Sequence, residues 1–244
     1  MNLAVAQNLI AFGSAGLGAL FTISVGASHR QLCALISFAA GTLLAATFFH
    51  ILPDAWPLLP ISAIVTALLS GYVLFYLISR YVFHVCPACA ASHFEEQTAA
   101  KFKSIAILLA VALTIHSLMD GVAIALARNP EHRMGHSIFL TITFHKFPEG
   151  LALCALLLKA GQEKMRALLA TLLFETSTLA GGLIGIFLLK GFAGSPWLDL
   201  VFIHIGGGFV YLALHATLNE MERHSPRFIF LFFLAGFILM GLIR

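Results

Sequence analysis

The chain has 244 residues, of which 60 % are hydrophobic and only 10 % are charged, and its formal net charge is +3. A soluble globular domain carries about 25 % charged residues, so this composition excludes a soluble protein. The small net charge gives no basis for a nucleic-acid partner. We therefore predict an all-α integral membrane protein that forms one transmembrane domain over residues 1–244.

Apolar stretches of about 20 residues, the length that crosses a bilayer as a helix, recur throughout the chain. Turn signals such as Pro53-Asp54, Asn129-Pro130 and Ser225-Pro226 separate them. A loop at 84–103 lies between the third and the fourth stretch. The eight predicted transmembrane helices are 3–26, 32–52, 60–83, 104–127, 136–159, 166–190, 197–218 and 227–243.

The short loops differ in their content of lysine and arginine, which sets the orientation of a membrane protein. Nine of the 14 lysine and arginine residues fall on the side that includes loop 84–103, and four fall on the other side. This excess predicts that the loop is cytoplasmic and that both termini are extracytoplasmic. We expect a multi-pass protein of the cell membrane, either a bacterial inner membrane or a plasma membrane.

Ionisable side chains lie inside the fourth and fifth predicted spans, where each costs about 2.5–3.5 kcal/mol or more. His116 and Asp120 are four residues apart, and His145 and Glu149 repeat that spacing on the next span. Residues four apart share one face of a helix, and each pair lies near the middle of its span. Antiparallel packing of the two helices can therefore bring the four side chains together near the bilayer midplane.

The donor set of these four residues indicates a divalent metal. Two buried carboxylates without a cation would be very costly. Two imidazoles and two carboxylates suit a transition metal such as Zn²⁺, Fe²⁺ or Mn²⁺, whereas Mg²⁺ and Ca²⁺ prefer oxygen ligands alone. Single buried histidines are weaker signals, because many are hydrogen-bonded packing residues; His50, His204 and His215 are of this kind.

At these residues the sequence resembles the ZIP (Zrt/Irt-like protein) family of divalent metal transporters. The runs HSLMDGVAIAL from His116 and HKFPEGLAL from His145 resemble the paired signatures of the family's fourth and fifth helices. The runs GTLLAATFFHILPDA and GGGFVYLALHATLNE resemble its second and seventh helices. The resemblance covers nearly the whole chain, and eight spans with extracytoplasmic termini fit the family.

The resemblance implies a transporter, not an enzyme, that moves Zn²⁺ toward the cytoplasm, with Fe²⁺, Mn²⁺ or Cd²⁺ as other possible substrates and no organic cofactor. It implies a homodimer in the lipid bilayer and an elevator-like movement of the helices that hold the site. Four residues would be the metal ligands: His116, Asp120, His145 and Glu149. Three more residues would lie along the path of the transported metal ion, the first on the outer side and the other two toward the cytoplasm: His50, His215 and Glu220.

Three positions depart from some members of the family. Leu43 stands where some bacterial members have a metal-binding methionine in the second span. Ser117 and Lys146 stand where members with two adjacent metal sites have ligands of the second metal. Glu175 does match a sixth-span carboxylate of the second metal site. The three carboxylates at positions 120, 149 and 175 and the one ammonium sum to −2, which one M²⁺ neutralises. We therefore predict a single metal site, with the Lys146 ammonium in the place of a second metal and paired with Glu175. The alternative is that Lys146 faces elsewhere.

The loop between the third and fourth spans has the pattern H-x-C-x-x-C-x-x-x-H, formed by His84, Cys86, Cys89 and His93. Two cysteines and two histidines at this spacing can form a zinc site, and ZIP proteins commonly carry a histidine-rich loop here. The same cysteines could instead be a thiol–disulfide redox pair, or they could be inert in a reducing cytosol.

The main alternative function is therefore a membrane thiol–disulfide electron carrier that uses Cys86 and Cys89. It would need relay cysteines in the spans, but Cys33 and Cys154 form no motif, and the paired histidine–carboxylate motif would remain unexplained. An intramembrane metalloprotease needs H-E-x-x-H, which this sequence lacks. Haem ligation by two facing histidines would leave the neighbouring carboxylates without a role.

Overall fold

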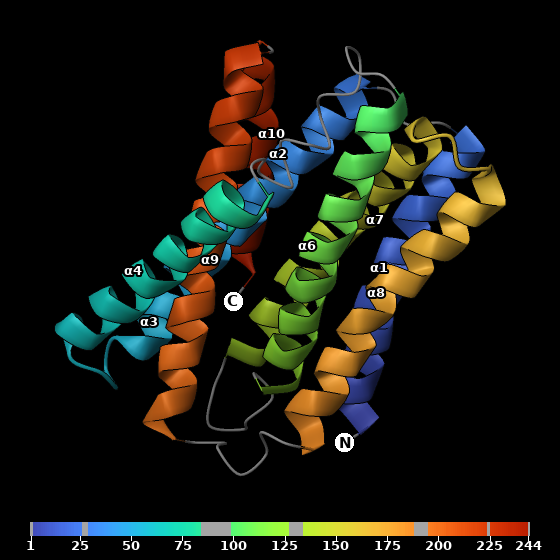
Figure 1. Ribbon diagram of the computed structural model, residues 1–244. Helices are drawn as coiled ribbons and strands as arrows, with labels where there is room; N and C mark the ends of the chain where they lie inside the picture. Colours follow the sequence, from blue (N-terminus) through green and yellow to red (C-terminus); the bar gives the residue numbers. More distant parts are fainter. Residues whose placement is uncertain are drawn as a thin grey trace.

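The structure is a computed structural model that describes residues 2–25, 29–83, 99–126, 134–187, 195–223 and 225–243. The described part of the chain is almost entirely helical and contains no strand. Figure 1 shows long helices that pack side by side and are inclined to one another. The predicted all-α class is confirmed for these residues, whereas most of loop 84–103 lies outside them.

The described helices follow the predicted spans in order. Prolines lie in the first turn of the last two, Pro196 in α9 and Pro226 in α10, where the missing backbone N–H costs no hydrogen bond. The helices are α1 (Asn2–Val25), α2 (His29–Ala46) with its continuations η1 (Thr47–Ile51) and α3 (Leu52–Ala55), α4 (Ile61–Leu77) with its continuation η2 (Ile78–Phe83), α6 (Ala99–Leu126), α7 (Met134–Lys159), α8 (Lys164–Phe187), α9 (Pro196–Arg223) and α10 (Pro226–Leu242).

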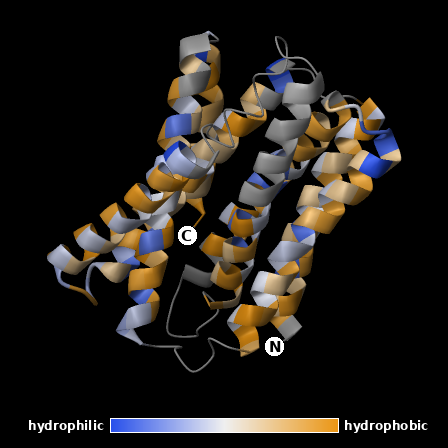
Figure 2. Cartoon of the chain, viewed as in Figure 1, coloured by the Kyte–Doolittle hydropathy of each residue, from blue (hydrophilic) through white to orange (hydrophobic). Residues whose placement is uncertain are grey.

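Several of these helices can cross a membrane. Within the described residues, five helical stretches are long and apolar enough: Leu3–Val25, Cys33–Ala55, Ile61–Tyr81, Lys164–Phe187 and Pro196–Leu218. The apolar helices Leu113–Leu126 and Pro226–Leu242 are shorter. Large apolar side chains face outward along the bundle, and Figure 2 shows hydrophobic residues over the length of the helices. This surface fits a multi-pass membrane protein.

The helices form two groups of four. One group contains α1, α6, α7 and α8, and the other contains α2, α4, α9 and α10. In Figure 1 the first group occupies the right side and the second group occupies the left side. The groups meet chiefly where α2 packs against α7.

Glycines explain why the helix pairs inside each group approach so closely. In four helix pairs, each of the two helices has a glycine that lies against the backbone of the other helix. A Cβ added at any of these glycines would overlap that backbone, so only glycine fits. The reciprocal glycines are Gly18 and Gly150 (α1–α7), Gly121 and Gly181 (α6–α8), Gly41 and Gly236 (α2–α10), and Gly71 and Gly207 (α4–α9). Among the described glycines, none makes such a contact across the α2–α7 boundary.

Candidate metal centre

The two predicted motifs converge at the meeting point of α6 and α7. One potential ligand atom from each of His116, Asp120, His145 and Glu149 lies within 4.8 Å of the others. Asp120, His145 and Glu149 are only 2 %, 4 % and 9 % exposed, and His116 is partly buried. The structure thus brings together the four side chains that the sequence spacing placed on facing helix surfaces.

Hydrogen bonds orient the imidazole of His145 toward the other donors. Its Nδ1 lies 3.0 Å from the Thr141 carbonyl oxygen, which holds the ring in place. Its Nε2 lies 3.2 Å from Asp120 Oδ2, and His116 Nε2 lies 3.5 Å from the same oxygen. A carbonyl oxygen behind the ring is a usual partner of a metal-binding histidine.

A fully buried lysine lies beside these donors. Lys146 Nζ is 3.2 Å from Asp120 Oδ2, 2.8 Å from Glu149 Oε2 and 3.1 Å from Glu175 Oε2. It also donates to Ser117 Oγ at 2.5 Å, and the Ser117 hydroxyl donates to Glu149 Oε1 at 2.9 Å. The expected pairing of Lys146 with Glu175 is therefore present, and the lysine does not turn away from the site.

The charges of this cluster are unbalanced without a cation. Three carboxylates carry −3 and the Lys146 ammonium carries +1, so the ionised groups sum to −2. Buried carboxylates need a compensating charge or hydrogen bonds. One divalent cation between the two imidazoles and the carboxylates of Asp120 and Glu149 would neutralise the site.

A cavity of about 290 Å³ extends from this cluster between the two helix groups. His116, Asp120, His145 and Glu149 all line it. The other residues that line the cavity are largely apolar. Three lining residues lie toward the helix ends near residues 29, 83 and 223: Ile36, Ser79 and Ala216. These helix ends belong to the side that the lysine and arginine count predicts to be cytoplasmic.

His50 and His215 lie outside the cluster. His50 Nε2 is 3.1 Å from the carbonyl oxygen of Met240, whose sulfur accepts a hydrogen bond from Thr141 Oγ1 at 3.1 Å. The His215 ring lies 4.6 Å from the Tyr211 ring, measured between centroids. Glu220 belongs to α9, but its side chain lies outside the described residues.

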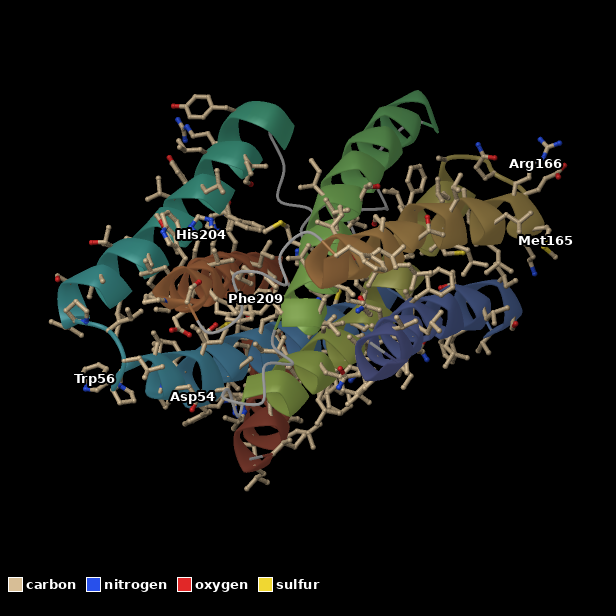
Figure 3. All side chains as sticks on the ribbon, turned by 90° about the horizontal axis from the view of Figure 1, so that it is seen from below. Asp54, Trp56, Met165, Arg166, His204 and Phe209 are labelled. Atoms are coloured by element: carbon tan, nitrogen blue, oxygen red, sulfur yellow. The ribbon has the colours of Figure 1, made fainter. Side chains whose placement is uncertain are left out.

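His204 and Phe209 line the wall that α9 contributes to the cavity. His204 Nδ1 lies 2.8 Å from Ser70 Oγ of α4, and the Phe209 ring lies 6.1 Å from the His145 ring. Figure 3 shows His204 beside α4 and Phe209 closer to the middle of the molecule. The sequence analysis missed Phe209 and Thr141, because neither carries a chemical signal apart from its position beside His145.

The four loop residues His84, Cys86, Cys89 and His93 lie outside the described residues, so the zinc and redox interpretations of this loop stay predictions. The two remaining cysteines, Cys33 and Cys154, are buried in α2 and α7, which belong to different helix groups.

These features define a multi-pass membrane protein with a buried histidine–carboxylate centre suited to a divalent cation. The family model described as "ZIP Zinc transporter" matches residues 88–244. The chain belongs to the ZIP zinc transporter family, as the resemblance of its motifs predicted. Membership in this family makes it a divalent metal transporter and not an enzyme.

Two similar proteins match most of the chain, and a third matches about half of it. Zinc transporter YKE4 of Saccharomyces cerevisiae is 24 % identical over 247 residues, which cover 86 % of this chain and 70 % of that protein. Zinc transporter ZupT of Chlorobium chlorochromatii is 27 % identical over 255 residues, which cover 98 % of this chain and 94 % of that protein. Metal cation symporter ZIP8 of Homo sapiens is 30 % identical over 119 residues, or 49 % of this chain and 25 % of that protein.

Proposed function

We propose that this chain moves Zn²⁺ across the cell membrane toward the cytoplasm, with Fe²⁺, Mn²⁺ and Cd²⁺ as further substrates of the same site. One observation carries the proposal: four donors from α6 and α7 converge within 4.8 Å in the interior of the helix bundle. Imidazole and carboxylate donors together suit these borderline metals better than Mg²⁺ or Ca²⁺. The ligands are His116, Asp120, His145 and Glu149.

The site holds one metal ion in this proposal. The Lys146 ammonium contacts Glu175, Glu149 and the hydroxyl of Ser117, which are the groups that would surround a second ion. A fixed cation at that point repels a second metal and leaves a charge of −2 for the first. Lys146 thus acts as a tethered counter-charge.

We propose that all eight long helices cross the membrane as one domain over residues 1–244, with both termini extracytoplasmic and the metal centre near the midplane. In this orientation, residues on the cytoplasmic side such as Ser79 and Ala216 line the cavity beside the site, which supports an inward-facing state. His50 would lie on the outer access path, and His215 and Glu220 on the way to the cytoplasm. A homodimer in the bilayer completes this proposal.

The division into two helix groups supports an elevator-like movement. Both metal-binding helices belong to the group of α1, α6, α7 and α8, whose members are joined by reciprocal glycine contacts. The boundary with the other group lacks such contacts among the described glycines and contains the cavity. Movement at this boundary would carry the site across the membrane without taking apart its ligands.

Zinc uptake into proteoliposomes that contain a zinc-sensitive dye tests the function and the site together. Wild type is compared with a variant that combines His145→Ala and Glu149→Ala, and with Glu163→Ala as a control that removes an exposed carboxylate outside the cluster. Uptake should be lost only in the double variant while all three proteins remain folded.

Two outcomes would contradict the proposal. Uptake that persists in the double variant would place the ligands elsewhere in the protein. Absence of uptake in wild type, together with a change in the redox state of Cys86 and Cys89 against a thioredoxin partner, would favour the electron carrier instead.

A further inference from the structure

A second line of buried polar groups leads away from the metal centre between α8 and α1. On α8, Glu175, Thr178 and Gly182 are three and four residues apart and therefore share one face. Asn8 of α1 lies against that face, because a Cβ added at Gly182 would overlap the Asn8 side-chain amide. Glu175, Thr178 and Asn8 are 1 %, 0 % and 2 % exposed.

Each of these three side chains has a buried polar atom without a hydrogen-bond partner among the described protein atoms. The atoms are Glu175 Oε1, Thr178 Oγ1 and Asn8 Oδ1. The Asn8 amide nitrogen, by contrast, donates to the Ala4 carbonyl oxygen at 2.9 Å. An unsatisfied buried polar atom costs about 1–3 kcal/mol, and buried polar groups in proteins almost always have a partner.

Buried water is the partner that best accounts for the three atoms. Proteins contain about one buried water per 27 residues, and such water usually bonds to polar groups that lack protein partners. Gly182 has no side chain, and Ala11, three residues after Asn8 on α1, is small and buried. The line therefore combines polar atoms that need partners with short side chains at these two positions.

We propose that a file of buried water molecules bridges Glu175, Thr178 and Asn8 and connects the centre with the end of the bundle at which α1 begins. The C-terminal end of α8 and the N-terminal end of α1 meet there, because Asn8 lies against Gly182 and the helices are antiparallel. Residues toward the opposite end, such as Ser79 and Ala216, line the metal cavity. Glu175 and its partner Lys146 would thus be hydrated from a side that the metal cavity does not reach, and the proposal does not depend on the transport function.

Reaction of introduced cysteines with Ag⁺, which is small enough to follow water, tests the file directly. The purified protein, with its four native cysteines replaced, carries Thr178→Cys; exposure to Ag⁺ is followed by unfolding and labelling of the remaining thiol. We expect Ag⁺ to protect Thr178→Cys from labelling. Thr171→Cys is the matched negative control, because Thr171 is also fully buried on α8 but donates to the Ala167 carbonyl oxygen at 2.9 Å.

The direction of the file is tested by adding Asn8→Leu to Thr178→Cys. An apolar side chain at position 8 should plug the file and abolish the protection by Ag⁺. Ala152→Cys, which lines the metal cavity, should remain protected in both backgrounds. The proposal is overturned if Thr178→Cys is labelled fully after Ag⁺ treatment, or if its protection survives Asn8→Leu, since water would then arrive from the cavity.

Thermal unfolding of variants with the native cysteines gives a second, independent measurement. If the Thr178 hydroxyl bonds to water, Thr178→Val removes bonds and lowers Tm by more than Thr171→Val does. If the position is dry, Thr178→Val removes an unsatisfied hydroxyl and raises Tm or leaves it unchanged. That second result would overturn the proposal even if the cysteine variants failed to fold.

Discussion

The buried lysine offers the sharpest test of how charge sets the capacity of the metal centre. In wild type, three carboxylates and the Lys146 ammonium sum to −2, which one divalent ion neutralises. Lys146→Asp changes the sum to −4, which two divalent ions neutralise. We therefore expect the number of zinc ions bound per chain to rise from one to two.

The same substitution should make stability depend on metal. Removal of one partner from a buried ion pair costs about 3–5 kcal/mol, and Lys146 is fully buried against three carboxylates. A ligand at a concentration of 100 Kd stabilises the folded state by about 2.7 kcal/mol for each site. Two zinc ions together would contribute about 5.4 kcal/mol and so offset the loss, and the metal-free variant should unfold at a much lower temperature than the loaded one.

The assay is elemental analysis of zinc per purified chain, combined with thermal unfolding in the presence and absence of zinc. Lys164→Asp is the matched control, because it makes the same change of charge at an exposed residue of α8. It should bind one zinc ion and keep the stability of wild type. A stoichiometry of one in Lys146→Asp, with no new dependence of stability on zinc, would refute the role given to Lys146.

Three further predictions concern the surroundings of the site. Ser117→Ala removes the hydroxyl that bridges the ammonium and a carboxylate of the cluster, so zinc affinity measured by calorimetry should fall about 10–100-fold. Ser177→Ala should leave zinc affinity unchanged, because the Ser177 hydroxyl donates within its own helix. Gly121→Ala should lower stability by about 1–3 kcal/mol, because its Cβ would overlap the Thr178 carbonyl, whereas Gly13→Ala meets no atom within 4 Å and should be tolerated. Zinc uptake should fall as the pH is lowered from about 7.5 to 5.5, since metal ligands must be deprotonated to bind; uptake that is independent of pH would contradict this.

Local patterns in the sequence were enough to predict the class of protein and the four side chains at the centre of the proposed site. Apolar stretches long enough to cross a bilayer predict helices whatever their partners are. The spacing of His116 to Asp120 and of His145 to Glu149 places each pair on one helix face. The count of charges around Lys146 also predicted its pairing with Glu175, and the structure shows this ion pair.

The arrangement of the side chains around that centre depends on contacts between helices that are distant in the sequence. Ser117 bridges Lys146 and Glu149 of another helix, and no local pattern predicts such a contact. His50 illustrates the same limit: it bonds to the carbonyl oxygen of Met240, 190 residues away along the chain. Contacts of this kind depend on how distant helices pack, and that packing is set by the summed fit of many glycines and apolar side chains rather than by any one motif.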